Sequence, residues 1–197
     1  MQLNWLEIKR QLFHLIVGIV LVILLNIDFI DLTILIATLI LLIIFSIISK
    51  IFQNSFFNWF LDHFDRPVDK SRIPARGAMT YLLGMIIVLS LFKKDIALAS
   101  ILVMVVGDSV SPLVGMHFAK TKHILNEKKL IEGTIAGVIA AFIAASFFVS
   151  HLEAILAALI GMFVEIIDFK YFRSSFLDDN ITIPIVSALI IYLSRII

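Results

Sequence analysis

Long apolar runs, separated by shorter polar segments, make up most of this chain. A helix needs about 20 mostly apolar residues to cross the hydrocarbon core of a bilayer. By this criterion the sequence predicts about seven transmembrane helices, at residues 11–27, 32–48, 77–92, 96–118, 133–150, 152–167 and 181–197. We therefore predict an all-α, polytopic integral membrane protein in which residues 1–197 form a single transmembrane domain.

The polar segments differ between the two predicted sides of the membrane. On the side of the carboxyl terminus the connections are only turns, near residues 26–31, 93–95 and 151. On the side of the amino terminus they are longer, at residues 50–76, 120–132 and 168–180. Aromatic residues within 51–65 suit an interfacial amphipathic helix, and a plain connector explains them equally well. Any chemistry is therefore predicted on the side of the amino terminus.

Composition narrows the class of protein. Hydrophobic residues form 61% of the chain and charged residues 16%, which is far from the composition of soluble domains. The absence of cysteine excludes disulfides, thiolate metal sites and cysteine nucleophiles. Because 16 basic residues nearly balance 15 acidic ones, the chain carries no overall charge suited to a nucleic-acid partner.

The basic residues nevertheless lie mostly on one side. With seven spans, 13 of the 16 Lys and Arg residues fall on the side of the amino terminus, and only Lys93, Lys94 and Arg195 fall on the other. Such an excess marks the cytoplasmic side of a membrane protein. We therefore predict a multi-pass protein of the cell membrane, with a cytoplasmic amino terminus and an active site that faces the cytoplasm.

Asp108 is the main candidate for chemistry, because it stands midway along an apolar run in the stretch VVGDSVSPLVG. An acidic side chain at the centre of a bilayer costs about 2.5 to 3.5 kcal/mol and usually faces a bundle interior. Ser111, Gly115 and Ala119 follow at helical spacing, so this stripe is predicted to face protein. Pro112 lacks the amide that would bond the Asp108 carbonyl, which leaves two oxygens for a cation such as Mg²⁺. The alternative is an Asp that only holds helices together.

The first run begins with WLEIKRQLFH, in which Glu7, Arg10 and His14 share one helix face. His14 lies deepest in the membrane and is a candidate general base. A solvated interfacial face explains Glu7 and Arg10 without any function, and a structural role is the alternative for His14.

Two further segments suit anion binding at the starts of predicted spans. Arg76 lies at the membrane boundary, where a planar guanidinium can bind phosphate, and a topogenic role is the alternative. The segment KKLIEGT places Lys129 and Glu132 just before a span that opens with Gly133 and Thr134. Exposed amides at the start of a helix attract anions, and glycine allows close approach.

Carboxylates gather near the ends of the last two spans. Glu165 and Asp168 share a helix face, and the segment LDDNITIP contains Asp179 and Asn180. An Asn at such a place is usually a helix cap. Together with Asp108, however, Asp179 and Glu165 form a candidate carboxylate cage for a metal ion that carries phosphates.

These residues jointly suit phosphoryl or nucleotidyl transfer, in which cations neutralise phosphate charge and a base orients the attacking hydroxyl. The candidates for that base are His14, Glu132 and Asp179. No GxxxxGK[ST] phosphate loop is present, and the acceptor is predicted to be a lipid that enters from the bilayer. A small ion or solute transporter is an alternative, but it would carry polar residues through the full membrane thickness.

The motifs also resemble those of a known family. In chain order they are E-x-x-R-x-x-x-H (Glu7 to His14), R-G-x-x-x-Y-x-x-G (Arg76 to Gly84), G-D-S (Gly107 to Ser109), E-G-T (Glu132 to Thr134) and D-N-x-x-I-P (Asp179 to Pro184). This order resembles the polyprenol kinase family, which includes dolichol kinase, phytol kinase and the CTP-dependent diacylglycerol kinase of fungi.

The resemblance implies transfer of the terminal phosphate of CTP to a lipid alcohol, either a prenol or diacylglycerol, with Mg²⁺ as cofactor. It implies that Asp108 is central to nucleotide and metal binding. It implies nucleotide contacts from a larger set, namely Arg76, Gly107, Ser109, Lys120, Lys129, Gly133, Thr134 and Asn180. The family is related in pattern to phosphatidate cytidylyltransferases, so a CDP-lipid synthase is the alternative, and a homodimer is left open.

Overall fold

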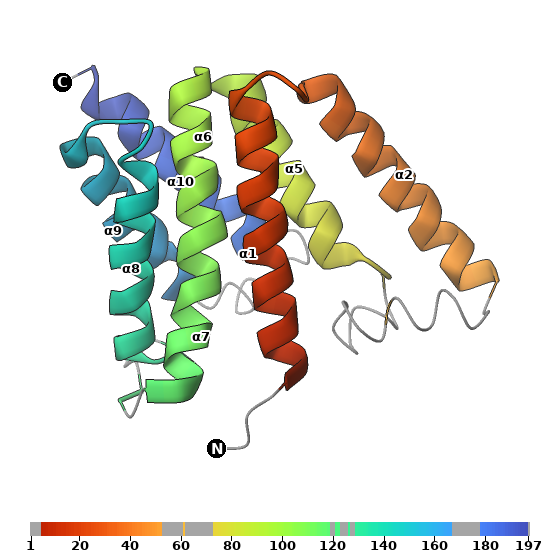
Figure 1. Cartoon of the computed structure of the whole chain (residues 1–197), viewed down its shortest axis with the longest axis horizontal. Coiled ribbons are helices and arrows are strands. Elements are labelled where there is room, and N and C mark those ends of the chain that lie inside the picture. Colours follow the sequence, from red (N-terminus) through yellow and green to blue (C-terminus); the bar gives the residue numbers. More distant parts are fainter. Residues whose placement is uncertain are drawn as a thin grey trace.

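The chain folds into helices that run up and down beside one another (Figure 1). The computed structural model describes residues 5–52, 61, 73–118, 121–122, 126, 129–166 and 178–196. Within these residues every regular element is a helix, apart from an isolated antiparallel β-bridge between Lys122 and Leu130. The all-α prediction is thus confirmed for the described part of the chain.

A helix stands at each predicted position. The elements are α1 (Trp5–Asn26), α2 (Leu32–Ile51), α5 (Arg76–Leu91), α6 (Lys94–Leu102), the π-helical segment η1 (Val103–Gly107), α7 (Asp108–Phe118), α8 (Ile131–Ala145), α9 (His151–Ile166) and α10 (Asp179–Ser194). Because α6, η1 and α7 follow one another without interruption, they form one rod, which corresponds to the predicted helix at residues 96–118.

Three helices among the described residues are long and apolar enough to cross a membrane. They are α1, α2 and the rod over Lys94–His117. By contrast, α5, α8, α9 and α10 contain 15 or 16 residues, which gives a length of about 24 Å. That is shorter than the ~30 Å hydrocarbon core, so these four helices do not meet the length criterion for a span by themselves. The chain is a membrane protein, and its seven spans stay a prediction.

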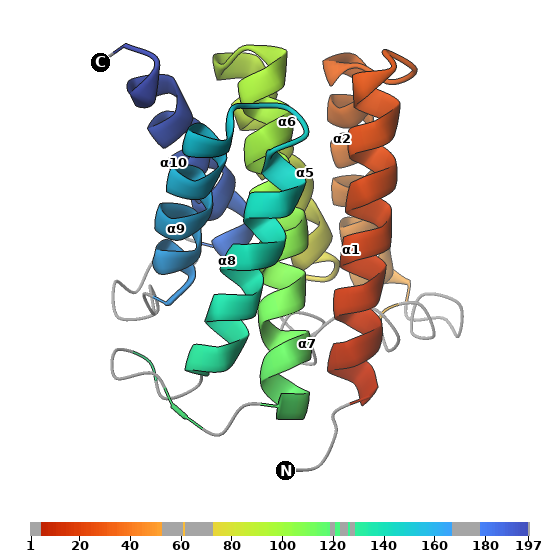
Figure 2. The same cartoon turned by 60° about the vertical axis from the view of Figure 1, so that its left-hand side comes forward.

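The rod of α6, η1 and α7 forms the centre of the bundle. In the apolar 18-residue stretch of the rod, 72% of the residues are buried. The corresponding shares are 22% for α1 and 17% for α2. The rod stands between α1 and α8, while α2 leans outward at the edge beside α5 (Figures 1 and 2). Every residue from Ile96 to Leu102 is buried. Asp108 lies further along this rod, at the start of α7, and is partly buried.

Helices α7 and α8 cross at backbone contact because glycines line their crossing. A Cβ at Gly133 would collide with the carbonyl oxygen of Ser111. A Cβ at Gly137 would lie 3.0 Å from the carbonyl oxygen of Gly107 and 2.8 Å from Cε of Met162. Small residues allow such close approach between membrane helices. The stripe predicted from Ser111 and Gly115 does face protein, as the burial of both residues shows.

Two glycines of α5 provide a matched test of this packing. A Cβ at Gly84 would overlap the backbone carbonyl oxygen of Asn180, whereas a Cβ at Gly77 meets nothing within 4 Å. We expect Gly84→Ala to lower the free energy of unfolding by about 1 to 3 kcal/mol, because α5 and α10 must separate. Gly77→Ala should leave it unchanged or slightly higher. Thermal unfolding in detergent measures both, and equal midpoints for the two variants would contradict this packing.

The end of the bundle that holds the carboxyl terminus is closed by ion pairs and short turns. The turns at residues 27–31 and 92–93 lie close to predicted ones, whereas the turn at 146–150 falls within the span predicted at residues 133–150. Arg195 reaches Asp95 at 2.7 Å and Glu153 at 2.5 Å, which joins the end of α10 to the starts of α6 and α9. Lys94 pairs with Asp28 at 2.5 Å across a second turn. Exposed pairs of this kind each contribute about 0 to 1 kcal/mol.

The opposite end is where α1, α5, α8 and α10 begin and where α2, α7 and α9 end. We call it the N-terminal end of the bundle. Helix α1 begins at this end and α10 ends at the opposite one (Figure 1), as an odd number of spans requires.

Candidate functional site

Most of the predicted site residues lie at the N-terminal end of the bundle, because they occupy the first or last turns of helices. Arg76 begins α5, Glu132 begins α8, Glu165 is in the last turn of α9 and Asp179 begins α10. The bundle therefore brings together four segments that are far apart in sequence. Asp108, at the start of α7, lies deeper within the central rod.

A buried ion pair between Lys129 and Glu165 is the strongest polar contact in this region. The Glu165 side chain has 0% exposure, and its Oε1 accepts hydrogen bonds from Nζ of Lys129 and, at 3.3 Å, from Oγ of Ser111. The other oxygen, Oε2, is buried without a hydrogen-bond partner among the described residues. Breaking such a pair by removing one partner usually costs about 3 to 5 kcal/mol. The pair thus fixes the Lys129 ammonium in one place.

Two further carboxylates act on the same ammonium. Burial alone would lower the pKa of Lys129, but the negative charges of Glu165, Asp108 and Asp179 outweigh burial and raise it. Lys129 therefore stays cationic at neutral pH. These four charged groups come from the start of α7, the segment before α8, the end of α9 and the start of α10. We call them the charged cluster.

The helix geometry changes at Asp108 itself. The rod is π-helical over Val103–Gly107 and returns to α-helix at Asp108, whose amide donates to the carbonyl of Met104. Single π-helical turns inside α-helices are frequent at functional sites. Pro112 lies one turn later within α7, where it has no amide to offer the Asp108 carbonyl.

The residues on either side of Asp108 have packing roles. Gly107 is buried, and a Cβ there would collide with Sδ of Met162. Ser109 is fully buried, and its hydroxyl has no hydrogen-bond partner among the described residues. Gly107 and Ser109 therefore pack between the rod and the neighbouring helices. That they contact the nucleotide stays a prediction.

Arg76 and Asn180 meet where α5 and α10 begin. Nη2 of Arg76 lies 3.9 Å from Oδ2 of Asp178, which caps α10 through the amide of Asn180 at 3.1 Å. The Asn180 side chain donates to Oγ1 of Thr80 at 3.2 Å and to the carbonyl of Gly77 at 3.4 Å. Asn180 thus joins two helices, which is more than a simple cap does.

Ala75, the residue before Arg76, has a left-handed backbone with φ of 59°. This conformation is unfavourable for a residue with a Cβ, and such residues are concentrated at functional sites. This backbone conformation of Ala75 turns the chain into α5 and so determines the position of Arg76.

Glu132 and Thr134 hold the segment that precedes α8. The Glu132 carboxylate accepts from the amide of Thr121 at 3.2 Å and from its hydroxyl at 2.9 Å. The Thr134 hydroxyl donates to the carbonyl of Leu130 at 3.4 Å. Asn126 reaches the carbonyl of Ile166 at 3.2 Å, which ties the same segment to the end of α9.

His14 is placed in α1 against α5. Its ring lies 4.1 Å from that of Tyr81, whose hydroxyl donates to the His14 carbonyl at 3.3 Å. Tyr81 also lies within the electrostatic influence of Asp108. About two turns before His14, Glu7 pairs with Arg10 and accepts from the Gln11 side chain at 2.9 Å.

Some predictions fall outside the described residues. They include Lys120 as a nucleotide contact, Ala119 in the stripe, Asp168 near the metal and most of the interfacial helix at residues 51–65.

The predicted metal cage is not assembled as expected. No group of three His, Cys, Asp or Glu residues that could hold a metal ion occurs among the described residues. Because Glu165 is held by Lys129 and Ser111, its role as a metal ligand stays a prediction. Mg²⁺ usually takes one or two carboxylates together with phosphate oxygens and water. Asp108 and Asp179, both partly exposed, fit that smaller donor set.

The sequence named these residues without their contacts in three cases. Ser111 donates to Glu165, Asp178 pairs with Arg76, and Tyr81 packs against His14. A signal existed for Asp178, because an Asp just before a predicted helix is a typical N-cap. A signal for Tyr81 was its polar hydroxyl within the apolar run of residues 77–92. The contact of Ser111 with Glu165 joins residues 54 apart and left no signal in the sequence.

The fold and the site together define a helical membrane protein with a charged cluster at one end of its bundle. No protein-family model and no solved structure matches the chain. Two curated proteins, both named CTP-dependent diacylglycerol kinase 1, are similar to it. The one from Schizosaccharomyces pombe is 28% identical over 134 residues, which are 59% of this chain and 59% of the relative. The one from Eremothecium gossypii is 27% identical over 138 residues, which are 59% of this chain and 43% of the relative.

The aligned part thus spans 59% and 43% of the lengths of these relatives. The similarity supports a relationship to lipid kinases, and it does not point to dolichol or phytol kinases in particular.

Proposed function

We propose that this protein is a CTP-dependent lipid-alcohol kinase. The observation that carries the proposal is the charged cluster, in which Lys129 is paired with a buried Glu165 and lies within the electrostatic reach of Asp108 and Asp179. The similarity to two CTP-dependent diacylglycerol kinases supports CTP as donor and favours diacylglycerol as acceptor over a prenol.

In the proposed reaction, a lipid hydroxyl oxygen attacks the γ-phosphorus of CTP. A new P–O bond forms to the lipid, the bond from the γ-phosphorus to the β–γ bridging oxygen breaks, and CDP leaves with that oxygen. Lys129 and Arg76 would neutralise phosphate charge, which is the main requirement of phosphoryl transfer. Mg²⁺ held by Asp108 would neutralise charge on the phosphates when bound.

The hydroxyl proton passes to a carboxylate or an imidazole. Among the three candidates, Glu132 accepts hydrogen bonds from the amide and the hydroxyl of Thr121, and the ring of His14 in α1 packs at a tilt against that of Tyr81 in α5. We propose that Asp179 takes the proton, because its charge and that of Asp108 act on the same ammonium, that of Lys129.

The proposed orientation places the N-terminal end of the bundle in the cytoplasm. It rests on the 13 basic residues of that side, and it gives the cluster access to cytoplasmic CTP. Because α5, α8, α9 and α10 are short, the cluster would lie at the depth of lipid headgroups. A lipid hydroxyl could then reach it without leaving the bilayer.

Purified protein in lipid nanodiscs tests the proposal. With CTP, Mg²⁺ and diacylglycerol it should form phosphatidate and CDP, whereas phytol and dolichol test the prenol acceptors, and ATP tests the donor. If phosphatidate and CTP instead yield diphosphate and a CDP-lipid, the protein is a cytidylyltransferase and the proposal is wrong.

A further inference from the structure

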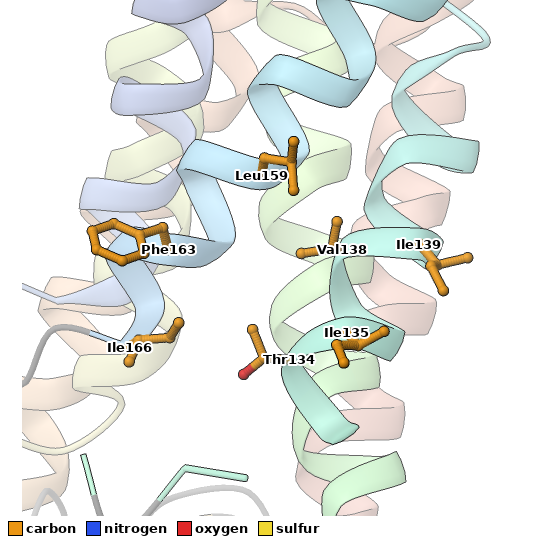
Figure 3. Close-up of a pocket in the computed structure, with 7 residues that line it drawn as sticks. All are labelled: Thr134, Ile135, Val138, Ile139, Leu159, Phe163 and Ile166. Atoms are coloured by element: carbon orange, nitrogen blue, oxygen red, sulfur yellow. The ribbon is translucent and has the colours of Figure 1, made fainter. Parts of the chain in front are cut away.

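An apolar groove lies on the outer surface of the bundle between α8 and α9 (Figure 3). Its volume is 350 Å³, within the usual range for small-molecule sites. Six lining residues are apolar, namely Ile135, Val138, Ile139, Leu159, Phe163 and Ile166. The seventh, Thr134, contributes a hydroxyl, which points into the gap between the two helices on the side of Ile166 (Figure 3).

The groove forms because the small residues of α8 and α9 face other helices and not the space between these two. The buried residues of α8 are Gly133, Gly137, Ala141 and Ala145, and the first three of them face α7 or line the rod. Helix α9 likewise buries Gly161 against α10 and the rod. The large side chains that remain form a rim, in which Ile135 is 55% exposed and Phe163 is 51% exposed. Ile166, 4% exposed, is part of the floor.

One end of the groove, at Thr134 and Ile166, lies at the N-terminal end of the bundle, where the charged cluster also lies. Thr134 lies in the first turn of α8, five residues after Lys129, and Ile166 directly follows Glu165 in α9. The lining continues for about two turns of each helix, which is a length of about 10 Å. A ligand that fills the groove and reaches the cluster must therefore have an apolar chain and a polar head.

We infer that the α8–α9 groove binds one hydrocarbon chain of the lipid acceptor and so directs the hydroxyl of that lipid to the charged cluster. This inference rests on the proposed function and names the part of the protein that recognises the substrate. Any outer surface of a membrane protein touches lipid. This site differs because it is a recess that ends beside the helix ends from which Lys129 and Glu165 come, so it should prefer the acceptor over phospholipids of the bulk bilayer.

Photolabelling tests the inference directly. The probe is a diacylglycerol that carries a diazirine midway along one chain, in nanodiscs of phosphatidylcholine. We expect labels on peptides from residues 131–145 and 151–166, and we expect unlabelled diacylglycerol to compete for them. Labelling that is spread over all outer helix faces, or that diacylglycerol does not reduce, would overturn the inference.

A matched pair of variants on α9 adds a kinetic test. Leu159→Trp fills the groove from its half-exposed rim, whereas Leu152→Trp makes the same change two turns away at a 67% exposed residue outside the groove. For diacylglycerol with long chains, Leu159→Trp should lower kcat/KM about ten-fold. Dibutyrylglycerol, whose chains are too short to fill the groove, should be phosphorylated equally by both variants, and the KM for CTP should not change.

The two hypotheses fail in different ways. Equal effects of Leu159→Trp and Leu152→Trp on the long-chain acceptor, in an active enzyme, would overturn the groove assignment and leave the proposed function intact. A wild-type protein that phosphorylates no lipid alcohol would overturn the proposed function, whatever the labelling shows.

Discussion

Replacement of Asp108 by Asn is expected to abolish lipid-dependent CTP turnover, with a fall in kcat of at least about 100-fold. The change keeps the shape of the side chain and removes the charge that acts on Lys129 and Tyr81. Because a carboxylate within a membrane helix costs about 2.5 to 3.5 kcal/mol, the thermal stability of the variant should equal or exceed that of the wild type. Initial rates of CDP release and thermal unfolding in detergent measure the two effects.

Asp28→Asn is the control for this substitution, because Asp28 lies at the opposite end of the bundle with 83% side-chain exposure. It should change neither turnover nor stability appreciably. An Asp108→Asn protein with near-normal turnover would show that Asp108 only joins helices.

Removal of Lys129 should have the largest effect on stability. Lys129→Met leaves the fully buried Glu165 carboxylate without its cation, which should lower the free energy of unfolding by about 3 to 5 kcal/mol. The double variant Lys129→Met with Glu165→Leu removes both charges, so it should regain most of that stability. It should nevertheless stay inactive, because no ammonium remains to neutralise phosphate charge. Thermal unfolding and CDP release measure stability and activity on the same preparations.

Lys94→Met provides the matched control, since Lys94 pairs with Asp28 at an exposed site at the other end of the bundle. It should leave both quantities close to the wild-type values. A double variant that recovers activity together with stability would mean that the pair serves only the fold.

The helices could be predicted from the sequence because each one is an apolar run of nearly constant hydropathy. Their ends were harder to place. The helix that starts at Gly133 was expected to continue to residue 150, whereas α8 ends at Ala145. Phe147 and Phe148 lie in the turn that follows. Hydropathy cannot mark such an end, since the turn is as apolar as the helix. A local signal was present, because Ser150 and Glu153 form a reciprocal capping box at the start of α9.

The candidate site could be predicted only as a set of residues, not as an arrangement. Hydropathy and charge placed Arg76, Lys129, Glu165 and Asp179 at the same end of the bundle, and the structure confirms that placement. Their pairing depends on how helices pack, which no local pattern records. Glu165 was grouped with metal ligands because carboxylates were its neighbours in sequence. Its position beside Lys129 follows from the contact of α8 with α9, across 36 residues of chain.

Glycines illustrate the same limit. The sequence suggested that Gly133 lets an anion approach the start of α8, but its Cα lies against the backbone of α7. The residue type was informative, since only a glycine fits at this crossing. That its neighbour is helix α7 required the structure, and its contact with the nucleotide stays a prediction.

The central claim is that the charged cluster transfers the terminal phosphate of CTP to a lipid alcohol. The most direct measurement compares two labelled forms of CTP, with ³²P at the γ or at the α position, in nanodiscs that contain diacylglycerol. The account predicts that the γ label appears in extracted lipid as phosphatidate and that the α label stays in the aqueous phase as CDP. Recovery of the α label in the lipid, or of neither label, would contradict it.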